Sequence, residues 1–293
     1  MPDFNKISPT ARGTLYALTF CDVPYAKELL QKTHALDNLT QFAKQVGMNS
    51  DPNSWLNKKI LALFAPNAEL RLKSTLAILK QRGIKNILEM ASGLSPLGLI
   101  MTEDPTVNYI ETDLPEMLEQ KKAAVSAVLD EKGEKRQNLL LASANALNFE
   151  ELRSAAKDLP GPIAIINQGL LRYLTDDEKF QVAQNVRKIL IEKGGLWISP
   201  DFQPLEGRHW LLNYVHNRLT RRITDRGTRR NAFRNEKELD KFLNDSKFKF
   251  QTIPQLELVI GELASAKNFN ISKRKIQKRC SGLMNYVFTP NDK

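Results

Sequence analysis

The alternation of short apolar runs with longer helical segments is the feature that most limits how this chain can fold. Five apolar runs cover residues 84–90, 107–111, 138–142, 163–167 and 196–201. The segments between them carry helix-start signals, such as Pro115 and the capping-box pair Thr175 and Glu178. Strands that alternate with helices form parallel βαβ units, whose right-handed crossovers place helices on both faces of a sheet. The sequence therefore predicts a doubly wound, mostly parallel α/β sheet.

The regions on either side of this alternation complete the expected organisation. Residues 1–83 have helical patterning throughout and are expected to form an N-terminal helical cap. Residues 84–293 then form the α/β domain, in which 202–246 make a basic helical lid inserted after the fifth strand. Two closing strands are expected, at 248–260 and 283–289. A chain of 293 residues accommodates the cap and the domain as one compact unit.

Turn and capping residues divide the predicted cap into helices. Pro24 suits the first turn of a helix that ends near Gly47, and Asp51 opens a second helix. Asn67 is placed to cap a further helix, which ends at Gly83. We therefore expect three separate helices between Pro24 and Gly83.

Composition excludes several classes of protein. Hydrophobic residues make up 42% and charged residues 26%, which is typical of a folded globular protein rather than a disordered or fibrous one. No apolar run reaches the ~18 residues of a membrane helix, and the polar start MPDFNKIS lacks the pattern of a signal peptide. Neither Cys21 nor Cys280 has metal-ligand spacing around it. We expect a reduced, cytoplasmic protein with no disulfide, no metal site and no membrane contact.

The net charge of +10 is concentrated in the last third of the chain. Residues 1–206 carry 24 Lys and Arg against 25 Asp and Glu, whereas residues 207–293 carry 19 against 8, a balance of +11. Eight arginines and no lysine lie between residues 208 and 234, and a second basic cluster at 273–279 is expected to be an exposed loop. This asymmetry favours an anionic partner: a small acid, a phosphate or a nucleic acid.

The turn after the first predicted strand has the composition of a ligand-binding loop. Gly93 has no Cβ and Ala91 has only a methyl group, so a ligand can approach the backbone closely. Asp113 ends the second strand, 20 residues after Gly93, where its carboxylate suits the two hydroxyls of a ribose. Ligands of open α/β sheets bind beyond the carboxyl ends of the strands. Gly93 and Asp113 together therefore predict a nucleotide-like ligand.

Two kinds of nucleotide ligand are compatible with such a loop. A dinucleotide needs the pattern G-x-G-x-x-G for its pyrophosphate, and Ala91 and Pro96 interrupt that pattern. Glu89 would repel a pyrophosphate but suits a cation. S-adenosylmethionine carries both an ammonium and a sulfonium, so it fits this loop better, and a nicotinamide dehydrogenase is the minor alternative.

Three ordered motifs between residues 10 and 201 resemble a known family. The run ILEMASGLS is similar to the first motif of class I S-adenosylmethionine-dependent methyltransferases. YIETDLPEMLEQK (109–121) and INQGLLRYLTDDE (166–178) resemble motifs of the leucine carboxyl methyltransferase family and its bacterial relatives, often described as polyketide O-methyltransferases. The stretch 10–29 is similar to that family's opening helix. The resemblance implies a Rossmann-like methyltransferase fold with S-adenosylmethionine as the cofactor.

The resemblance also implies roles for individual residues. Gly93 would face the methionine moiety of the cofactor and Asp113 its ribose, while Arg12 and Arg71 would bind its carboxylate. Glu89 and Ala91 belong to the same loop motif.

The sequence departs from the family pattern at four positions. Ala91 replaces a glycine, and Ser95 stands where an aspartate is common. Asn145 stands where an aspartate usually binds the adenine amine, and its carbonyl can still accept that hydrogen bond. Gln168 replaces a glutamate, which removes a charge from the cofactor site.

The methyl acceptor is expected to be a small acid, either a carboxylate or a phenol. Arg218 and Arg222 flank a predicted amphipathic helix and are the candidates for binding it. A carboxylate needs no base, whereas a phenol would need one, for which His209 and His216 are weak candidates. Tyr173 is a candidate for lining the methyl-transfer cavity. A purely structural role remains the alternative for each of these residues.

The preferred hypothesis is therefore an S-adenosylmethionine-dependent O-methyltransferase, with two alternatives open. One is an RNA-modifying methyltransferase that holds phosphates with its basic last third. The other is a vestigial cofactor-binding protein, which the changes at Ala91, Asn145 and Gln168 would suit. The acceptor's identity and the oligomeric state are left open.

Overall fold

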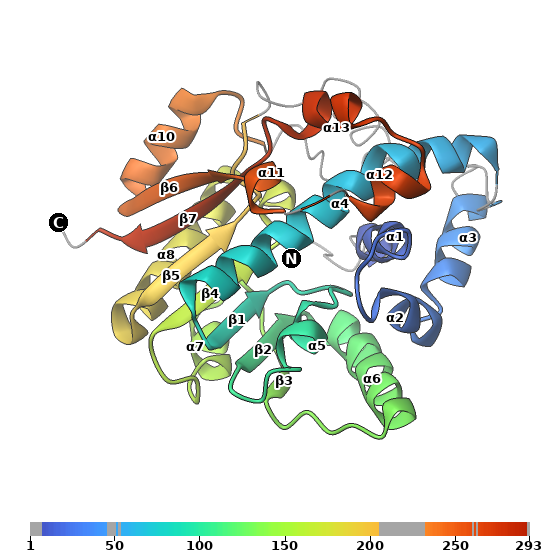
Figure 1. The fold of residues 1–293 in the computed structure, drawn as a ribbon. Coiled ribbons are helices and arrows are strands. Elements are labelled where there is room, and N and C mark those ends of the chain that lie inside the picture. Colours follow the sequence, from blue (N-terminus) through green and yellow to red (C-terminus); the bar gives the residue numbers. More distant parts are fainter. Residues whose placement is uncertain are drawn as a thin grey trace.

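A computed structural model describes residues 8–45, 51, 54–204, 232–259, 261 and 263–291. The centre of the molecule is a seven-stranded sheet in the order β3-β2-β1-β4-β5-β7-β6 (Figure 1). The strands are β1 (Asn86–Met90), β2 (Asn108–Asp113), β3 (Leu139–Ser143), β4 (Ile163–Asn167), β5 (Gly195–Ser199), β6 (Phe248–Pro254) and β7 (Met284–Pro290). The first five strands are parallel, and β7 pairs antiparallel with both β5 and β6. The predicted doubly wound, mostly parallel sheet is confirmed.

Helices cover both faces of this sheet, as the alternating pattern predicts. The helices before β1 are α1 (Ser8–Leu18), α2 (Ala26–Lys32), α3 (Ala35–Gln45) and α4 (Trp55–Arg82). Those between the strands are α5 (Leu97–Met101), α6 (Pro115–Lys132), α7 (Phe149–Ala155), the 3-10 turn η2 (Leu171–Tyr173) and α8 (Asp176–Lys193). After β5 come α10 (Glu236–Asp245), α11 (Gln255–Leu258), α12 (Ala264–Asn268) and α13 (Lys273–Cys280).

The two faces of the sheet carry separate hydrophobic cores, because successive side chains of each strand point to opposite faces. Ile87 points to the core that α4, α5 and α6 cover, and Leu88 points to the core that α7, α8 and α10 cover. This alternation follows from the pleat, which directs successive side chains to opposite faces. Leu15 and Leu29, from α1 and α2, are part of the first core. The helices before β1 therefore share a core with the sheet, and a division of the chain at residue 83 stays a proposal.

Several capping predictions are confirmed. Thr175 and Glu178 form the expected capping box at the start of α8, and Pro115 is in the first turn of α6. Asn235 accepts a hydrogen bond from the backbone of Glu238, so the helix expected at the end of the insertion is present as α10. Residues 205–231 of the predicted lid lie outside the described residues.

The predicted division of the cap into helices is wrong in two places. The helix expected from Pro24 to Gly47 is two helices, α2 and α3. The two helices expected between Asp51 and Gly83 are the single helix α4, which contains Pro66. A proline inside a helix leaves the carbonyl four residues earlier without its usual donor. Here the Nη1 of Arg279 donates to that carbonyl, on Ala62, at 3.5 Å, so a contact from the far end of the chain helps α4 to continue.

Two predictions near the C-terminus are also corrected. The strand expected to run through 248–260 ends at Pro254, where α11 begins. The basic cluster at 273–279, expected to be a loop, forms α13. Ile276 and Cys280 are four residues apart, so they lie on one side of this helix, where both are buried in a small core beside α4. The burial of these two side chains stabilises the helix, which the charged residues around them could not do.

Candidate functional site

The turn after β1 lies at the carboxyl ends of the central strands, where the sequence predicts a ligand site. Ala91 and Gly93 both have left-handed backbone, with φ of 49° and 52°. The backbone N–H of Gly93 donates to Oδ2 of Asp113 at 2.6 Å. The structure thus brings together the two residues that the sequence paired as ligand-binding candidates. The left-handed conformation of Ala91 shows that the loop keeps its turn with alanine in place of glycine.

Asp113 is well placed to receive further hydrogen bonds. Its Oδ1 accepts from the backbone N–H of Leu114 at 2.8 Å, so each carboxylate oxygen already has one backbone donor. Each oxygen also has a second acceptor position. Burial raises the pKa of this carboxyl, and the two backbone donors oppose that shift. A ligand that presents two hydroxyl groups would satisfy the remaining positions.

Buried donors without acceptors lie at the neighbouring carboxyl end of β4. The Nε2 atom of Gln168 and the Nε atom of Arg71 are buried and have no hydrogen-bond partner in the part of the chain that the structure describes. A Cβ built on Gly169 would lie 3.8 Å from Nη1 of Arg71, which places this guanidinium beside the turn after β4. Burial and the nearby charge of Arg172 lower the pKa of Arg71. Because buried donors are almost always paired in proteins, this arrangement indicates the place of an anionic or carbonyl ligand.

The hydroxyl of Ser92 extends this group of donors toward the glycine loop. Its Oγ is also buried and without a partner. Ser92 follows β1 and Gln168 follows β4, and these two strands are adjacent and in register, with Met90 opposite Asn167. Ser92 was not among the residues predicted for the site, although its position between Ala91 and Gly93 could have indicated it.

Asp201, which follows β5, holds the turn after β4 in place. Its carboxylate accepts hydrogen bonds from the backbone of Gly169 at 2.8 Å and of Leu171 at 3.1 Å. It also accepts from Nδ2 of Asn167 at 2.9 Å. Sequence reasoning placed Asp201 at the end of a strand but gave it no role, because its partners are 30 to 34 residues away in the chain.

Helix α1 lies across the same edge of the sheet. A Cβ built on Gly93 would lie 3.2 Å from the Cβ of Ala11, so α1 packs closely on the glycine loop. The next residue, Arg12, donates to Oε1 of Gln120 on α6 at 3.2 Å. The two arginines expected to bind one carboxylate thus have different neighbours: Arg12 lies against α6 and Arg71 beside the turn after β4.

Tyr173 connects the β4 turn to α1. The side chain of Tyr173 is buried and makes a hydrogen bond with the side chain of Thr10, and burial raises its pKa. A phenol with a raised pKa keeps its proton at neutral pH, so Tyr173 is suited to donating a hydrogen bond and unsuited to acting as a base.

Glu89 lies beneath the loop rather than on its open side. Its side chain is 1% exposed and accepts a hydrogen bond from the hydroxyl of Tyr109 at 2.8 Å. The neighbouring Glu111 pairs with the buried Lys121, whose Nζ is 2.7 Å from Oε2. Burial raises the pKa of Glu89 to about 7, while the Lys121 charge opposes the shift. Glu89 therefore supports the loop from within the protein, and a direct contact with a cofactor cation stays a proposal.

Asn145 lies in the turn after β3 and already uses part of its side chain. Its Oδ1 accepts from the backbone N–H of Leu147 at 3.0 Å. The carbonyl oxygen retains a second acceptor position, which an adenine amine could use. The predicted role of Asn145 stays a proposal. His209, His216, Arg218 and Arg222 lie outside the described residues.

Some solved structures of known proteins are similar to this chain over most of its length. The first five strands of the sheet are parallel, and β7 lies antiparallel between β5 and β6. The methyltransferase domain of a bacterial Hen1, CtHen1, has a TM-score of 0.49 and 17% identity over 76% of this chain and 99% of its own. Human N-acetylserotonin methyltransferase, solved in complex with SAM, has a TM-score of 0.47 and 11% identity over 97% and 72% of the two chains.

A third solved structure, the mitomycin 7-O-methyltransferase MmcR, has a TM-score of 0.48 and 13% identity over 99% of this chain and 74% of its own. At such identities the likeness concerns the fold alone. No family model matches the chain, and no curated protein matches it. Within the described part of the chain, no helix is both long and apolar enough to cross a membrane.

Proposed function

We propose that this protein is an S-adenosylmethionine-dependent O-methyltransferase whose acceptor is a small acid. The observation that carries the proposal is the set of sealed polar atoms at the ends of β1 and β4. Ser92 Oγ, Gln168 Nε2 and Arg71 Nε have no hydrogen-bond partner among the described residues, and all three suit the carboxylate of an amino acid. Asp113 lies beside the same loop, where a ribose would accompany such a carboxylate.

The residues present fit this cofactor. Left-handed Gly93 keeps the turn after β1 tight, and Asp113 offers acceptors to both ribose hydroxyls. Arg71 is the better placed of the two candidate arginines for the cofactor carboxylate, because it lies beside Gly169 in the turn after β4. Gln168 itself offers a hydrogen-bond donor where the related family has a carboxylate, so it favours the carboxylate end of the cofactor over the ammonium.

The main task of the protein in methyl transfer is to align the cofactor and the acceptor. The bound cofactor supplies an electrophilic methyl group, which passes to an acceptor oxygen while the sulfur keeps the electron pair of the broken bond. The enzyme's share is to hold the two reacting atoms in line. A carboxylate acceptor is already ionised at neutral pH. Such an acceptor needs no base from the protein.

The motifs shared with the leucine carboxyl methyltransferase family support membership of that group within the methyltransferases. Their order in the chain matches β1, β2 and β4, the three strands that form the site. This subfamily assignment rests on the sequence motifs and stays part of the proposal.

Calorimetric titration with S-adenosylmethionine tests the cofactor site. We expect Asp113→Asn to weaken binding by about 10-fold to 100-fold, since it removes a charged hydrogen-bond acceptor. Asp158→Asn, on an exposed turn far from the loop in the sequence, is the matched control and should bind as the wild type does. Thermal unfolding of both variants shows whether the loop change affects folding. Absence of binding to the wild-type protein would refute the proposal.

The acceptor is found by a second experiment. The purified protein is added with S-adenosylmethionine to a cell extract that has been depleted of macromolecules, and mass spectrometry identifies any small molecule that gains one methyl group. Binding of the cofactor without methylation of any species would favour the vestigial alternative.

A further inference from the structure

Helix α13 has an unusual distribution of charge for its length. Five of its eight residues are Lys or Arg, and none is acidic. Lys273, Arg274, Lys275 and Lys278 form no ion pair or side-chain hydrogen bond with any described residue. Arg279 differs from them, because its guanidinium donates to the carbonyl of Ala62. The four unpaired cations are therefore available to a partner.

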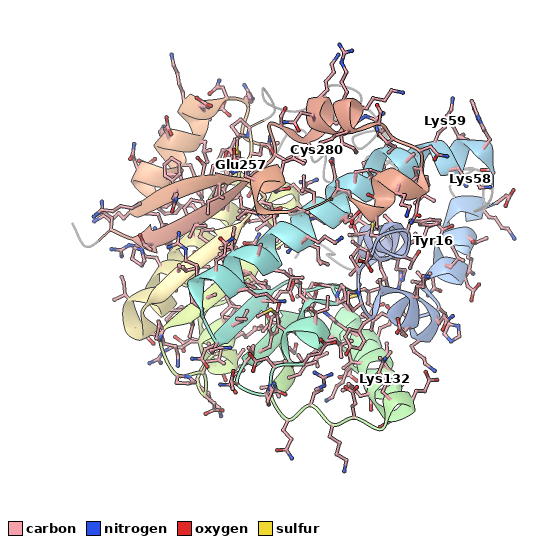
Figure 2. All side chains as sticks on the ribbon, in the orientation of Figure 1. Tyr16, Lys58, Lys59, Lys132, Glu257 and Cys280 are labelled. Carbon is pink, nitrogen blue, oxygen red and sulfur yellow. The ribbon has the colours of Figure 1, made fainter. Side chains whose placement is uncertain are left out.

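The packing of α13 fixes how these cations are presented. Ile276 and Cys280 are buried against α4, and the thiol of Cys280 lies 3.6 Å from Oδ1 of Asn67 (Figure 2). At about 100° per residue, these two anchors mark one side of the helix. The cations are spread around the remaining circumference. The helix is thus held rigidly on the body of the protein while its charged surface faces outward.

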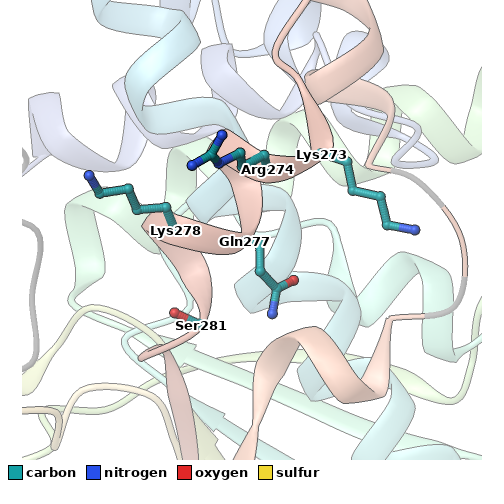
Figure 3. Close-up of a pocket in the computed structure, with 5 residues that line it drawn as sticks. All are labelled: Lys273, Arg274, Gln277, Lys278 and Ser281. Atoms are coloured by element: carbon teal, nitrogen blue, oxygen red, sulfur yellow. The ribbon is translucent and has the colours of Figure 1, made fainter.

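One flank of α13 forms a shallow, open pocket of about 470 Å³ (Figure 3). Its lining is two rows of side chains with helical spacing. Lys273, Gln277 and Ser281 form one row, and Arg274 and Lys278 form the other. Three cations therefore stand beside two neutral hydrogen-bonding groups.

The composition of this surface restricts the kind of partner. Stable protein interfaces have an apolar or aromatic centre, and membrane-surface helices insert apolar side chains. The exposed side of α13 offers only Lys, Arg, Gln and Ser, so it meets neither requirement. The exposed side of α13 offers several closely spaced cations with polar groups between them. This is the composition that binds a phosphodiester backbone.

The spread of the cations favours a flexible polyanion over a rigid one. A duplex would contact one line of side chains along the helix, whereas the cations here extend around most of its exposed circumference. A single strand can bend to follow them. The absence of aromatic residues from α13 removes base stacking, so contacts with the phosphates must provide the affinity.

We propose that α13 is a docking surface for a single-stranded polynucleotide, which it holds through its phosphates. The surface recognises charge and does not read sequence. It is separate from the cofactor loop and extends beyond the proposed methyl transfer, since binding here requires neither S-adenosylmethionine nor an acceptor.

Salt dependence of binding tests the proposal, with a fluorescent 20-nucleotide RNA of mixed, unstructured sequence as the probe. Four phosphate contacts, at a slope of about 0.7 each, predict that the affinity falls about 50-fold between 50 and 200 mM salt. The triple variant Lys273→Gln, Arg274→Gln, Lys278→Gln keeps one contact, so its affinity should be weak at low salt and fall only about threefold over the same range.

A matched control separates a local surface from overall charge. Lys80→Gln, Lys122→Gln, Lys135→Gln removes the same three charges from exposed positions on other elements and should leave RNA binding close to that of the wild type. Retained binding of S-adenosylmethionine and an unchanged melting temperature show that either triple variant is folded. These two measurements are independent of RNA binding, so a failed cofactor titration leaves this test intact.

Four outcomes would overturn the proposal. They are absence of RNA binding at 50 mM salt, equal loss in the two triple variants, equal affinity for polyglutamate or anionic phosphatidylserine vesicles, and tighter binding to a duplex of the same length. The proposal is supported if RNA binding by the wild type depends steeply on salt and if only the α13 variant loses this binding.

Discussion

Replacing Glu89 with glutamine should flatten the dependence of folding stability on pH. Glu89 and Glu111 are fully buried with a single ammonium, that of Lys121, so the three groups carry a net charge of −1 when all are ionised. Such a cluster retains a proton near neutral pH, and its titration belongs to the group as a whole. Burial raises the pKa of Glu89 from 4.5 to about 7.

The sign and size of the effect follow from this shift. Between the two pKa values the folded protein binds a proton that the unfolded chain has released, so stability is highest at low pH and is lost as the pH rises through about 7. This one group lowers the free energy of unfolding by about 2 kcal/mol between pH 5.5 and pH 8, taking 1.36 kcal/mol per pKa unit. Glu89→Gln leaves the neutral pair of Glu111 and Lys121, and its amide oxygen can still accept from Tyr109.

Urea unfolding of wild type and variant at pH 5.5 and pH 8 measures the effect. Comparing the change in stability between the two proteins removes the contribution of titrating groups outside the cluster of Glu89, Glu111 and Lys121. Glu119→Gln, at an exposed position on α6, is the control and should change with pH as the wild type does. If Glu89→Gln loses as much stability as the wild type over this range, the buried-proton account is refuted.

Three further substitutions test the packing and geometry around the site. Gly98→Ala should destabilise the protein by about 1–3 kcal/mol, because a Cβ there would overlap the Glu111 carboxylate and lie 2.8 Å from Cδ1 of Leu139; an unchanged urea midpoint would contradict this packing. Ala91→Gly should alter stability by less than about 1 kcal/mol, because relief of the left-handed alanine is offset by the greater freedom of the unfolded chain. A large decrease in the free energy of unfolding, measured by urea denaturation, would show that the methyl group of Ala91 makes stabilising contacts. Thr175→Ala removes the cap of α8 and should cost about 1 kcal/mol by thermal unfolding, whereas Thr175→Ser should cost much less.

The expectations that concern local structure agree well with the fold. Each parallel strand is a short apolar run between helix signals, and the structure has β4 at the residues expected, 163–167. The pairing of Gly93 with Asp113 was also predictable, because adjacent parallel strands bring their carboxyl ends to one edge. The caps of α8 and α10 depend on residues three positions apart and needed no tertiary information.

The errors occur where distant parts of the chain meet. Asn67 was expected to begin a separate helix, yet α4 continues through it. Arg279, over two hundred residues later, donates to the carbonyl that Pro66 leaves free. The basic cluster of α13 read as a loop because the charges dominate its composition. Its helix is anchored by Ile276 and Cys280, whose burial depends on α4.

The sequence by itself determined the alternating α/β architecture, the position of the glycine loop and the acidic residue beside it, since all of these follow from periodicity and from hydrogen bonds between near neighbours. Only the tertiary structure decided that Glu89 is sealed beneath the loop, that Arg71 and Gln168 present unpaired donors at its edge, and that α13 is an anchored helix. The physical reason is that burial and pairing depend on which side chains the fold brings together, and no local pattern encodes the neighbours of a residue across the sheet.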